Sequence, residues 1–122
     1  MKQDISNRAD IERAVYLFYE ELKKDESLVY FFTVVIPVNW NKHLKLMCDF
    51  WENVLFYTGD YEGNPLEAHR TINKRYPTTQ EHFDRWIKLF DSTMDHHFRG
   101  PNVERMKVLA KSIADVMLQK IH

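Results

Sequence analysis

Histidine is the residue type in this chain whose number and placement most favour a chemical role. The six histidines are His43, His69, His82, His96, His97 and His122. Their spacing does not match a four-ligand zinc site, and the sequence contains no HExxH, CxxC or glycine-rich phosphate loop. Most histidines on helix faces are solvated or hydrogen-bonded side chains, and we assign all of them to that class except His43 and His69. The single cysteine, Cys48, has no activating neighbour in the sequence and excludes an internal disulfide.

His69 has the most informative setting. The segment Asn64-Pro65-Leu66-Glu67 combines residues favoured at the N-cap, N1 and N3 positions, so it predicts a short helix that begins there and carries His69. The carbonyl of Pro65 lies one helical turn before His69 and could accept the proton of Nδ1, which would leave Nε2 free as a metal ligand. A planar iron cofactor needs only one such histidine, because the porphyrin supplies four ligands itself. The alternative is a surface histidine on a linker helix.

Apolar residues that recur every three or four positions predict an all-α protein with four substantial helices and one short one. The long helices are expected from Ala9 to Lys24, from Asn39 or Trp40 to Tyr57, over about twenty residues after Thr78, and from Pro101 to near the C-terminus. Thr78 and Glu81 form the predicted capping box of the third. The apolar segment before Pro37 could be a strand or a helical turn, and the helical context favours the turn. We expect residues 1–122 to form a single domain.

The same periodicity places three polar-tipped side chains on buried helix faces. Tyr19 lies beside the apolar stripe of the first helix, His43 belongs to the stripe of the second, and Trp86 to that of the third. The stripe of the second helix consists of Trp40, His43, Met47, Phe50 or Trp51, and Val54. Three phenylalanines of the third helix are expected to be ordinary core residues, namely Phe83, Phe90 and Phe98.

Composition excludes several classes of protein. Lys+Arg is 17 and Asp+Glu is 18, a balance that argues against binding to nucleic acid or to an anionic membrane. The N-terminal segment lacks the apolar core of a signal peptide, and no apolar stretch is long enough to span a bilayer. Three tryptophans, six tyrosines and eight phenylalanines are many rings for 122 residues, and they suit a helical protein that encloses something flat or packs its own rings together. We expect a soluble, cytoplasmic, monomeric protein.

Longer stretches of the sequence match a known family in order and spacing. They are Leu17-Phe-Tyr-Glu-Glu, Phe32, Trp40-Asn-Lys-His-Leu through Asp49-Phe-Trp, Thr58-Gly-Asp-Tyr-Glu-Gly-Asn-Pro-Leu-Glu-Ala-His, and His82-Phe-Asp-Arg-Trp-Ile-Lys-Leu-Phe. In these segments the chain resembles the truncated haemoglobins of the third group, which are short bacterial globins. The segment from Phe50 to His69 and the ring pair around Trp86 are the most specific parts.

The resemblance implies a two-on-two helical sandwich around haem b, with His69 as the iron ligand. It further implies that Tyr19, His43 and Trp86 face a ligand on the opposite, distal side of the haem. Other residues are implied to contact the cofactor, namely Phe32, Met47, Phe50 and Trp51. Arg70, together with Lys74 and Arg75, could pair with the haem propionates or could simply be solvated.

The resemblance implies a haem protein that binds oxygen, nitric oxide or carbon monoxide at a histidine-ligated iron, with redox chemistry on oxygen, nitric oxide or peroxide as an extension. The three donors Tyr19, His43 and Trp86 would favour slow ligand release or activation of an O–O bond over rapid transport. One alternative is an enzyme proper, a nitric oxide dioxygenase or peroxidase-like protein that depends on an external reductase. Another alternative is a cofactor-free helical interaction module. A further hypothesis is that His43 itself binds the iron when no ligand is present.

Overall fold

The computed structural model of this protein describes residues 2–35, 38–57, 73–74 and 78–121. These residues are helical apart from connecting segments and one isolated bridge between Gln3 and Phe98. The elements are α1 (Arg8–Leu22), α2 (Glu26–Tyr30), the short π-helix η1 (Phe31–Val35), α3 (Trp40–Phe56), α5 (Gln80–His97) and α6 (Pro101–Ile121). The predicted all-α fold is therefore confirmed, and the segment before Pro37 is helical as expected.

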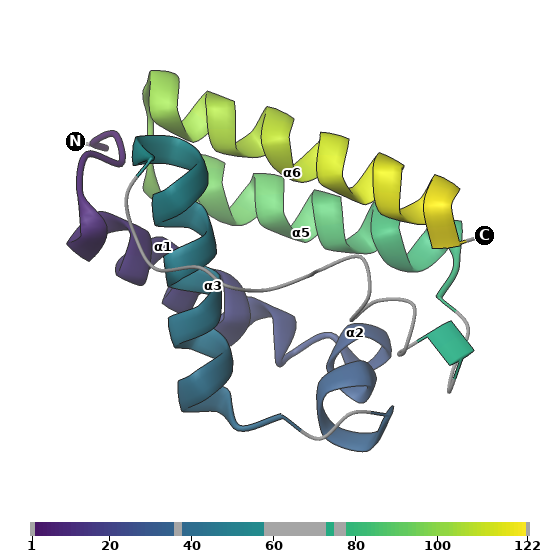
Figure 1. The fold of residues 1–122 in the computed structure, drawn as a ribbon. Helices are drawn as coiled ribbons and strands as arrows, with labels where there is room; N and C mark the ends of the chain where they lie inside the picture. The colour runs from purple at the N-terminus through teal and green to yellow at the C-terminus, as the bar shows by residue number, and fades with distance from the viewer. Residues whose placement is uncertain (1, 36–37, 58–72, 75–77, 122) are drawn as a thin grey trace.

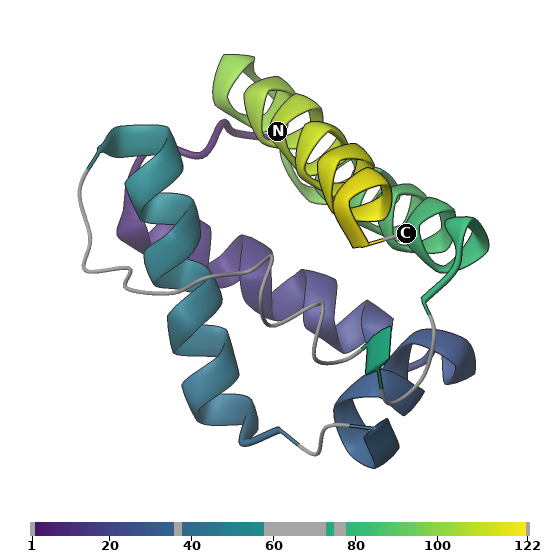
Figure 2. The ribbon, with the colours of Figure 1, turned by 45° about the vertical axis from the view of Figure 1, so that its right-hand side comes forward.

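The long helices are arranged as two pairs. Helix α1 packs against α3 and against α5, and α5 packs against α6. Figure 1 shows α5 and α6 side by side and antiparallel, with α3 crossing in front of α1. The turned view in Figure 2 shows the same pairs from the side, with α2 and η1 at the end where α1 finishes. This arrangement is the expected two-on-two sandwich, and it brings α1, α3 and α5 around one shared interior.

The face of α1 that the periodicity predicted to be buried is the face that forms the core. Ile11, Val15, Phe18 and Leu22 are all buried. Asn7 caps the helix by accepting a hydrogen bond from the Asp10 amide, as short polar residues do at this position. The neighbouring Tyr19 is only 6% exposed, so the sequence also placed this ring on the correct side.

Two details of the sequence prediction were wrong. Helix α5 is capped by Thr79 rather than Thr78, and the reciprocal partner at the N3 position is His82 rather than Glu81. The imidazole Nδ1 of His82 can accept the Thr79 amide proton in place of a carboxylate, and the N···N distance is 3.0 Å. The capping box therefore begins one residue later than predicted, because a neutral ring nitrogen takes the place of the expected carboxylate.

The second correction concerns α3. The apolar residues that are fully buried on this helix are Cys48, Trp51 and Leu55. Of these, only Trp51 belongs to the stripe that the sequence predicted to be buried. The residues of that stripe other than Trp51 are half-buried, namely Trp40, His43, Met47, Phe50 and Val54. The helix therefore carries two neighbouring apolar faces, one packed into the core and one only partly covered.

An N-terminal arm fixes the corner between α5 and α6. The carboxylate of Asp4 accepts hydrogen bonds from the amides of Asn102 and Val103, both at 3.0 Å, so it caps α6 from a distant part of the chain. Gly100 has φ of +149°, and a Cβ there would lie 2.3 Å from the Asp4 Cγ. A glycine is therefore required at this corner. Within the described residues, no helix is both long enough and apolar enough to cross a membrane.

Candidate functional site

The candidate site is built around a hydrogen bond between Tyr19 of α1 and His43 of α3. The Tyr19 hydroxyl oxygen and the His43 Nε2 lie 3.0 Å apart. The two rings meet edge to face, with centroids 5.0 Å apart. Tyr19 is buried while His43 is half-buried, so the pair lies at the boundary between the core and the partly covered face of α3.

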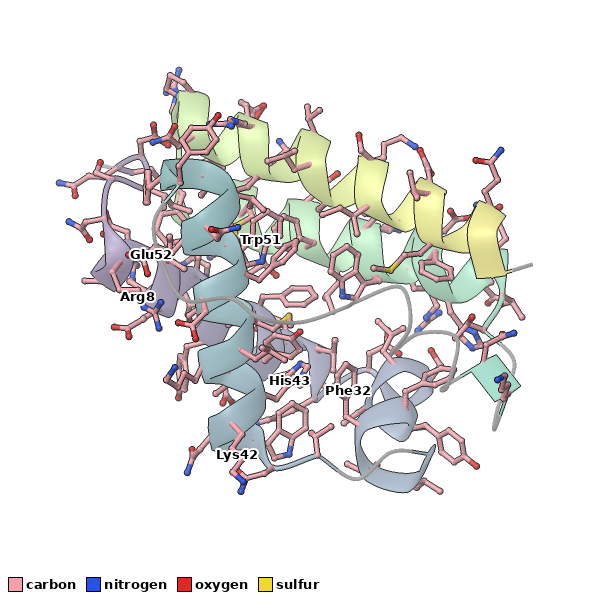
Figure 3. All side chains as sticks on the ribbon, in the orientation of Figure 1. Arg8, Phe32, Lys42, His43, Trp51 and Glu52 are labelled. Atoms are coloured by element: carbon pink, nitrogen blue, oxygen red, sulfur yellow. The ribbon has the colours of Figure 1, made fainter. Side chains whose placement is uncertain are left out.

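Two further rings surround this pair. Phe32 of η1 packs edge-on against Tyr19 and against His43, at centroid distances of 5.9 Å and 5.2 Å. Trp40, at the start of α3, stacks on Phe32 with an interplanar angle of 26°. Figure 3 shows Phe32 and His43 approaching each other between η1 and α3. We call Tyr19, Phe32, Trp40 and His43 the Tyr19 cluster. In this cluster the rings of Phe32 and Trp40 pack around the hydrogen bond between the Tyr19 hydroxyl and the His43 Nε2.

Burial controls the protonation of the tyrosine. It raises the pKa of the Tyr19 hydroxyl above its ordinary value, because a buried phenolate would lose its solvation. Like any tyrosine, Tyr19 carries its proton at neutral pH and can act as a donor, and the raised pKa extends the protonated range to more alkaline pH. Either the hydroxyl donates to a neutral Nε2, or an Nε2–H donates to the hydroxyl oxygen, according to the tautomer of His43. Only in the second arrangement, in which Nε2–H donates to the Tyr19 oxygen, is the Tyr19 O–H left to donate to a ligand.

Trp86 of α5 extends the site toward the second helix pair. Phe18, the residue before Tyr19, contacts Tyr19 on one side and Trp86 on the other, at centroid distances of 5.0 Å and 5.6 Å. Trp86 is half-buried. Its indole N–H is a group that can only donate a hydrogen bond.

The remaining predicted contact residues of α3 separate into two groups. Met47 and Phe50 lie on the same half-buried face as His43, one and two turns further along the helix. Trp51 is instead 5% exposed and lies in the core, where its ring stacks on Phe90. Figure 3 shows Trp51 pointing from α3 toward α5. Phe90 and Phe98 are buried core residues as expected, whereas Phe83 is half-buried.

The predicted proximal side lies outside the described residues. This applies to His69, to Arg70 and Arg75, and to the short helix predicted to start at Asn64. Lys74 is described and is helical and exposed. The roles assigned to these residues stay predictions.

An ion cluster that the sequence reasoning missed joins the two helices that carry Tyr19 and His43. The guanidinium of Arg8 on α1 lies 2.8 Å from Asp49 and 2.8 Å from Glu52, both on α3. Asp49 is buried, and its hydrogen bonds with Lys45 and Arg8 lower the pKa of its carboxyl. Figure 3 shows Arg8 and Glu52 side by side. No short-range pattern in the sequence indicates this contact, because 41 positions separate Arg8 from Asp49.

Cys48 adjoins this cluster but has no chemical role in the structure. It is a buried free cysteine. Burial raises the pKa of the Cys48 thiol to about 11, so the nucleophilic thiolate is scarce at neutral pH. This environment agrees with the lack of an activating neighbour in the sequence.

Comparisons with known proteins agree in sequence and in structure. No protein-family model matches the chain. The chain is 33% identical over 98 residues to the group 3 truncated hemoglobin ctb of Campylobacter jejuni, a match that covers 78% of this chain and 75% of the relative. The crystal structure of a group III truncated hemoglobin from the same organism has a TM-score of 0.86 and 27% identity, and the match covers 100% of this chain and 96% of that chain.

Proposed function

The chain belongs to the group III truncated haemoglobins, and from this premise we propose that it binds haem b through His69 and holds small diatomic ligands beside Tyr19, His43 and Trp86. Membership of the family makes it a globin-type haem protein. The observation that supports the proposed ligand site is the 3.0 Å hydrogen bond between Tyr19 and His43, which is surrounded by aromatic side chains. Such a pair is an unusual polar feature for an apolar interior, and a ligand-binding role accounts for it.

The described residues fit a haem on their side of the pocket. A porphyrin needs an apolar surface to cover its face, and the half-buried face of α3 offers Met47 and Phe50 beside His43. Phe32 adds a ring from η1 at a centroid distance of 5.2 Å from His43. The polar atoms on this surface can donate hydrogen bonds to a small ligand. His69 is the proposed iron ligand, since the porphyrin itself supplies four of the iron's ligands.

When bound, the haem supplies the iron at which oxygen, nitric oxide or carbon monoxide is held. Tyr19 is protonated at neutral pH, and its O–H can donate to a ligand that gains partial negative charge when the Nε2–H of His43 donates to the Tyr19 oxygen. That hydrogen bond from His43 then limits the rotation of the hydroxyl group. Trp86 offers an N–H that can only donate. Each such hydrogen bond would slow loss of the ligand.

The polar residues after His69 complete the proposal on the proximal side. Arg70 would pair with a haem propionate, and Lys74 and Arg75 are further candidates for that role. We infer a single domain over residues 1–122, in which Arg8, Asp49 and Glu52 fix the spacing of α1 and α3. Redox chemistry on oxygen, nitric oxide or peroxide is the second candidate function. The presence of three donors favours it, and it requires an external reductase or another source of electrons.

Stopped-flow measurement of oxygen dissociation from the reduced, haem-loaded protein tests this proposal. Loss of one hydrogen bond to a partly charged ligand costs about 1–3 kcal/mol, so Tyr19→Phe and Trp86→Phe should each release oxygen about 5 to 150 times faster. Tyr16→Phe is the matched control, because Tyr16 lies on the same helix and is 55% exposed. Wild-type rates in both pocket variants would contradict the proposal. Turnover of nitric oxide or peroxide with a supplied reductant distinguishes the second candidate.

A further inference from the structure

The indole ring of Trp86 is held by other rings. Its plane stacks on Phe90, one turn along α5, with a centroid distance of 5.5 Å and an interplanar angle of 15°. Phe18 of α1 meets Trp86 edge-on at 5.6 Å and 82°. Within the described part of the chain the ring is held by these contacts, which fix both its plane and its edge.

The stack continues from α5 to α3. Phe90 also stacks on Trp51 of α3, with a centroid distance of 5.5 Å and an interplanar angle of 19°. We call Trp86, Phe90 and Trp51 the aromatic stack. Phe90 and Trp51 are 2% and 5% exposed, so the inner two rings are enclosed by the core while Trp86 lies at the half-buried end. Phe18 packs its edge against Phe90 as well, at 5.3 Å and 70°.

Resting on the proposed function, we propose that Phe90 is a positioning residue for the ligand site, because it fixes the plane of Trp86 and so directs the indole N–H toward the ligand. The N–H lies at the edge of the indole ring, so a rotation of the ring plane turns the donor away from its acceptor. A hydrogen bond weakens steeply with misalignment, and binding groups must be held to within about 10–20°. Trp51 and Phe18 contact the Phe90 ring and limit its movement. Phe90 can therefore limit the rotation of the Trp86 ring that stacks on it.

A second buried phenylalanine, Phe98, serves as a comparison, because it belongs to the core but not to the aromatic stack. Phe98, at the end of α5, is 3% exposed and is therefore as buried as Phe90. Its contacts are with His97 and with the guanidinium of Arg13, which lies 5.1 Å from the ring centroid. It has no place in the aromatic stack. Phe98 therefore provides a control that removes the same chemical group at equal burial.

The experiment compares ring-removing and ring-retaining variants in the haem-loaded protein. Phe90→Leu and Phe90→Met remove the stacked ring, and Phe90→Met keeps more apolar volume if the leucine variant folds poorly. Phe90→Tyr retains the ring, and Phe98→Leu is the control. The measurements are the NMR order parameter of the Trp86 indole N–H and the C–O stretching frequency, both in the reduced, carbon monoxide-saturated protein, together with the oxygen dissociation rate.

In Phe90→Leu and Phe90→Met we expect the order parameter to fall toward about 0.6, the range of flexible groups. The C–O stretch should move to higher frequency, and oxygen should dissociate about 5 to 10 times faster, approaching Trp86→Phe. Phe90→Tyr should restore wild-type behaviour, and Phe98→Leu should lower stability alone. An unchanged order parameter in both ring-removing variants, or an equal fall in Phe98→Leu, would overturn the proposal. If Trp86→Phe itself leaves oxygen dissociation unchanged, Trp86 has no donor role, and the order parameter still decides whether Phe90 holds the ring.

Discussion

The hydroxyl of Tyr19 and the Nε2 of His43 lie 3.0 Å apart and connect α1 to α3 at the boundary of the core. Their helices are joined a second time by Arg8, which binds two carboxylates of α3. The two connections lie at opposite ends of α1, so they fix both the distance and the angle between the helices. The position of the Tyr19 hydroxyl therefore depends on how α1 and α3 are packed together.

The raised pKa of Tyr19 predicts a specific dependence of stability on pH. The folded state holds the phenol proton more tightly than the unfolded chain, whose tyrosines ionise near about pH 10. The resulting stability is fully present below about pH 10 and is lost as the pH rises further, because only the unfolded state then gains from releasing the proton. Urea unfolding between pH 8 and pH 11 should therefore show a steeper loss in wild type than in Tyr19→Phe. Equal slopes in the two proteins would contradict this account of the buried hydroxyl.

Removal of Arg8 should destabilise the fold because it leaves buried Asp49 with one partner fewer. Loss of a charged hydrogen-bond partner at a mostly buried carboxylate costs about 1–3 kcal/mol, and we expect Arg8→Ala to lower the free energy of unfolding by that amount. The matched control is Lys111→Ala. Its ion pair with Asp115 has side chains 66% and 62% exposed, and its loss should cost about 0.5 kcal/mol or less. Similar losses in the two variants would show that Arg8 is an ordinary surface residue.

The thiol of Cys48 should be unreactive in the native state. Its pKa of about 11 and its burial leave little accessible thiolate at pH 8. A chromogenic disulfide reagent should therefore modify native protein at least about 100 times more slowly than protein unfolded in guanidinium chloride. Rapid modification of the native protein would mean that α3 opens far more readily than its packing suggests.

Asp91 of α5 is expected to be a destabilising residue at neutral pH. Its Oδ1 is buried without a hydrogen-bond partner among the described residues, and burial raises the pKa of the carboxyl. Asp91→Asn removes the charge and should raise Tm by about 2–4 °C at pH 7. The gain should shrink as the pH falls through the raised pKa of the folded carboxyl, and it should vanish below about pH 3, where the carboxyl is protonated in both the folded and the unfolded state. Asp115→Asn, at an exposed position, is the control and should give no gain.

The sequence predicted those features of the fold that depend on periodicity. The buried face of α1, the long helices and the inward placement of Tyr19 all follow from local spacing, and the structure confirms them. The buried face of α3 was misplaced because two apolar stripes lie side by side on that helix, and only tertiary packing decides which of them enters the core. The contacts of Arg8 with α3 and the stacking of Trp51 on Phe90 could not be predicted either, since each joins residues that are distant in the sequence. The assignment of His69 rests on the start signals of its predicted helix and on the family resemblance, and it stays a prediction.

Binding of haem through His69 can be measured by the absorption spectrum of the haem-supplied protein. Wild type should show a strong Soret band that changes on addition of carbon monoxide to the reduced protein, and His69→Ala should bind haem weakly or not at all. His96→Ala, which removes an exposed histidine, should match wild type. A wild type without a Soret band, or a His69→Ala variant that binds haem like wild type, would contradict the account.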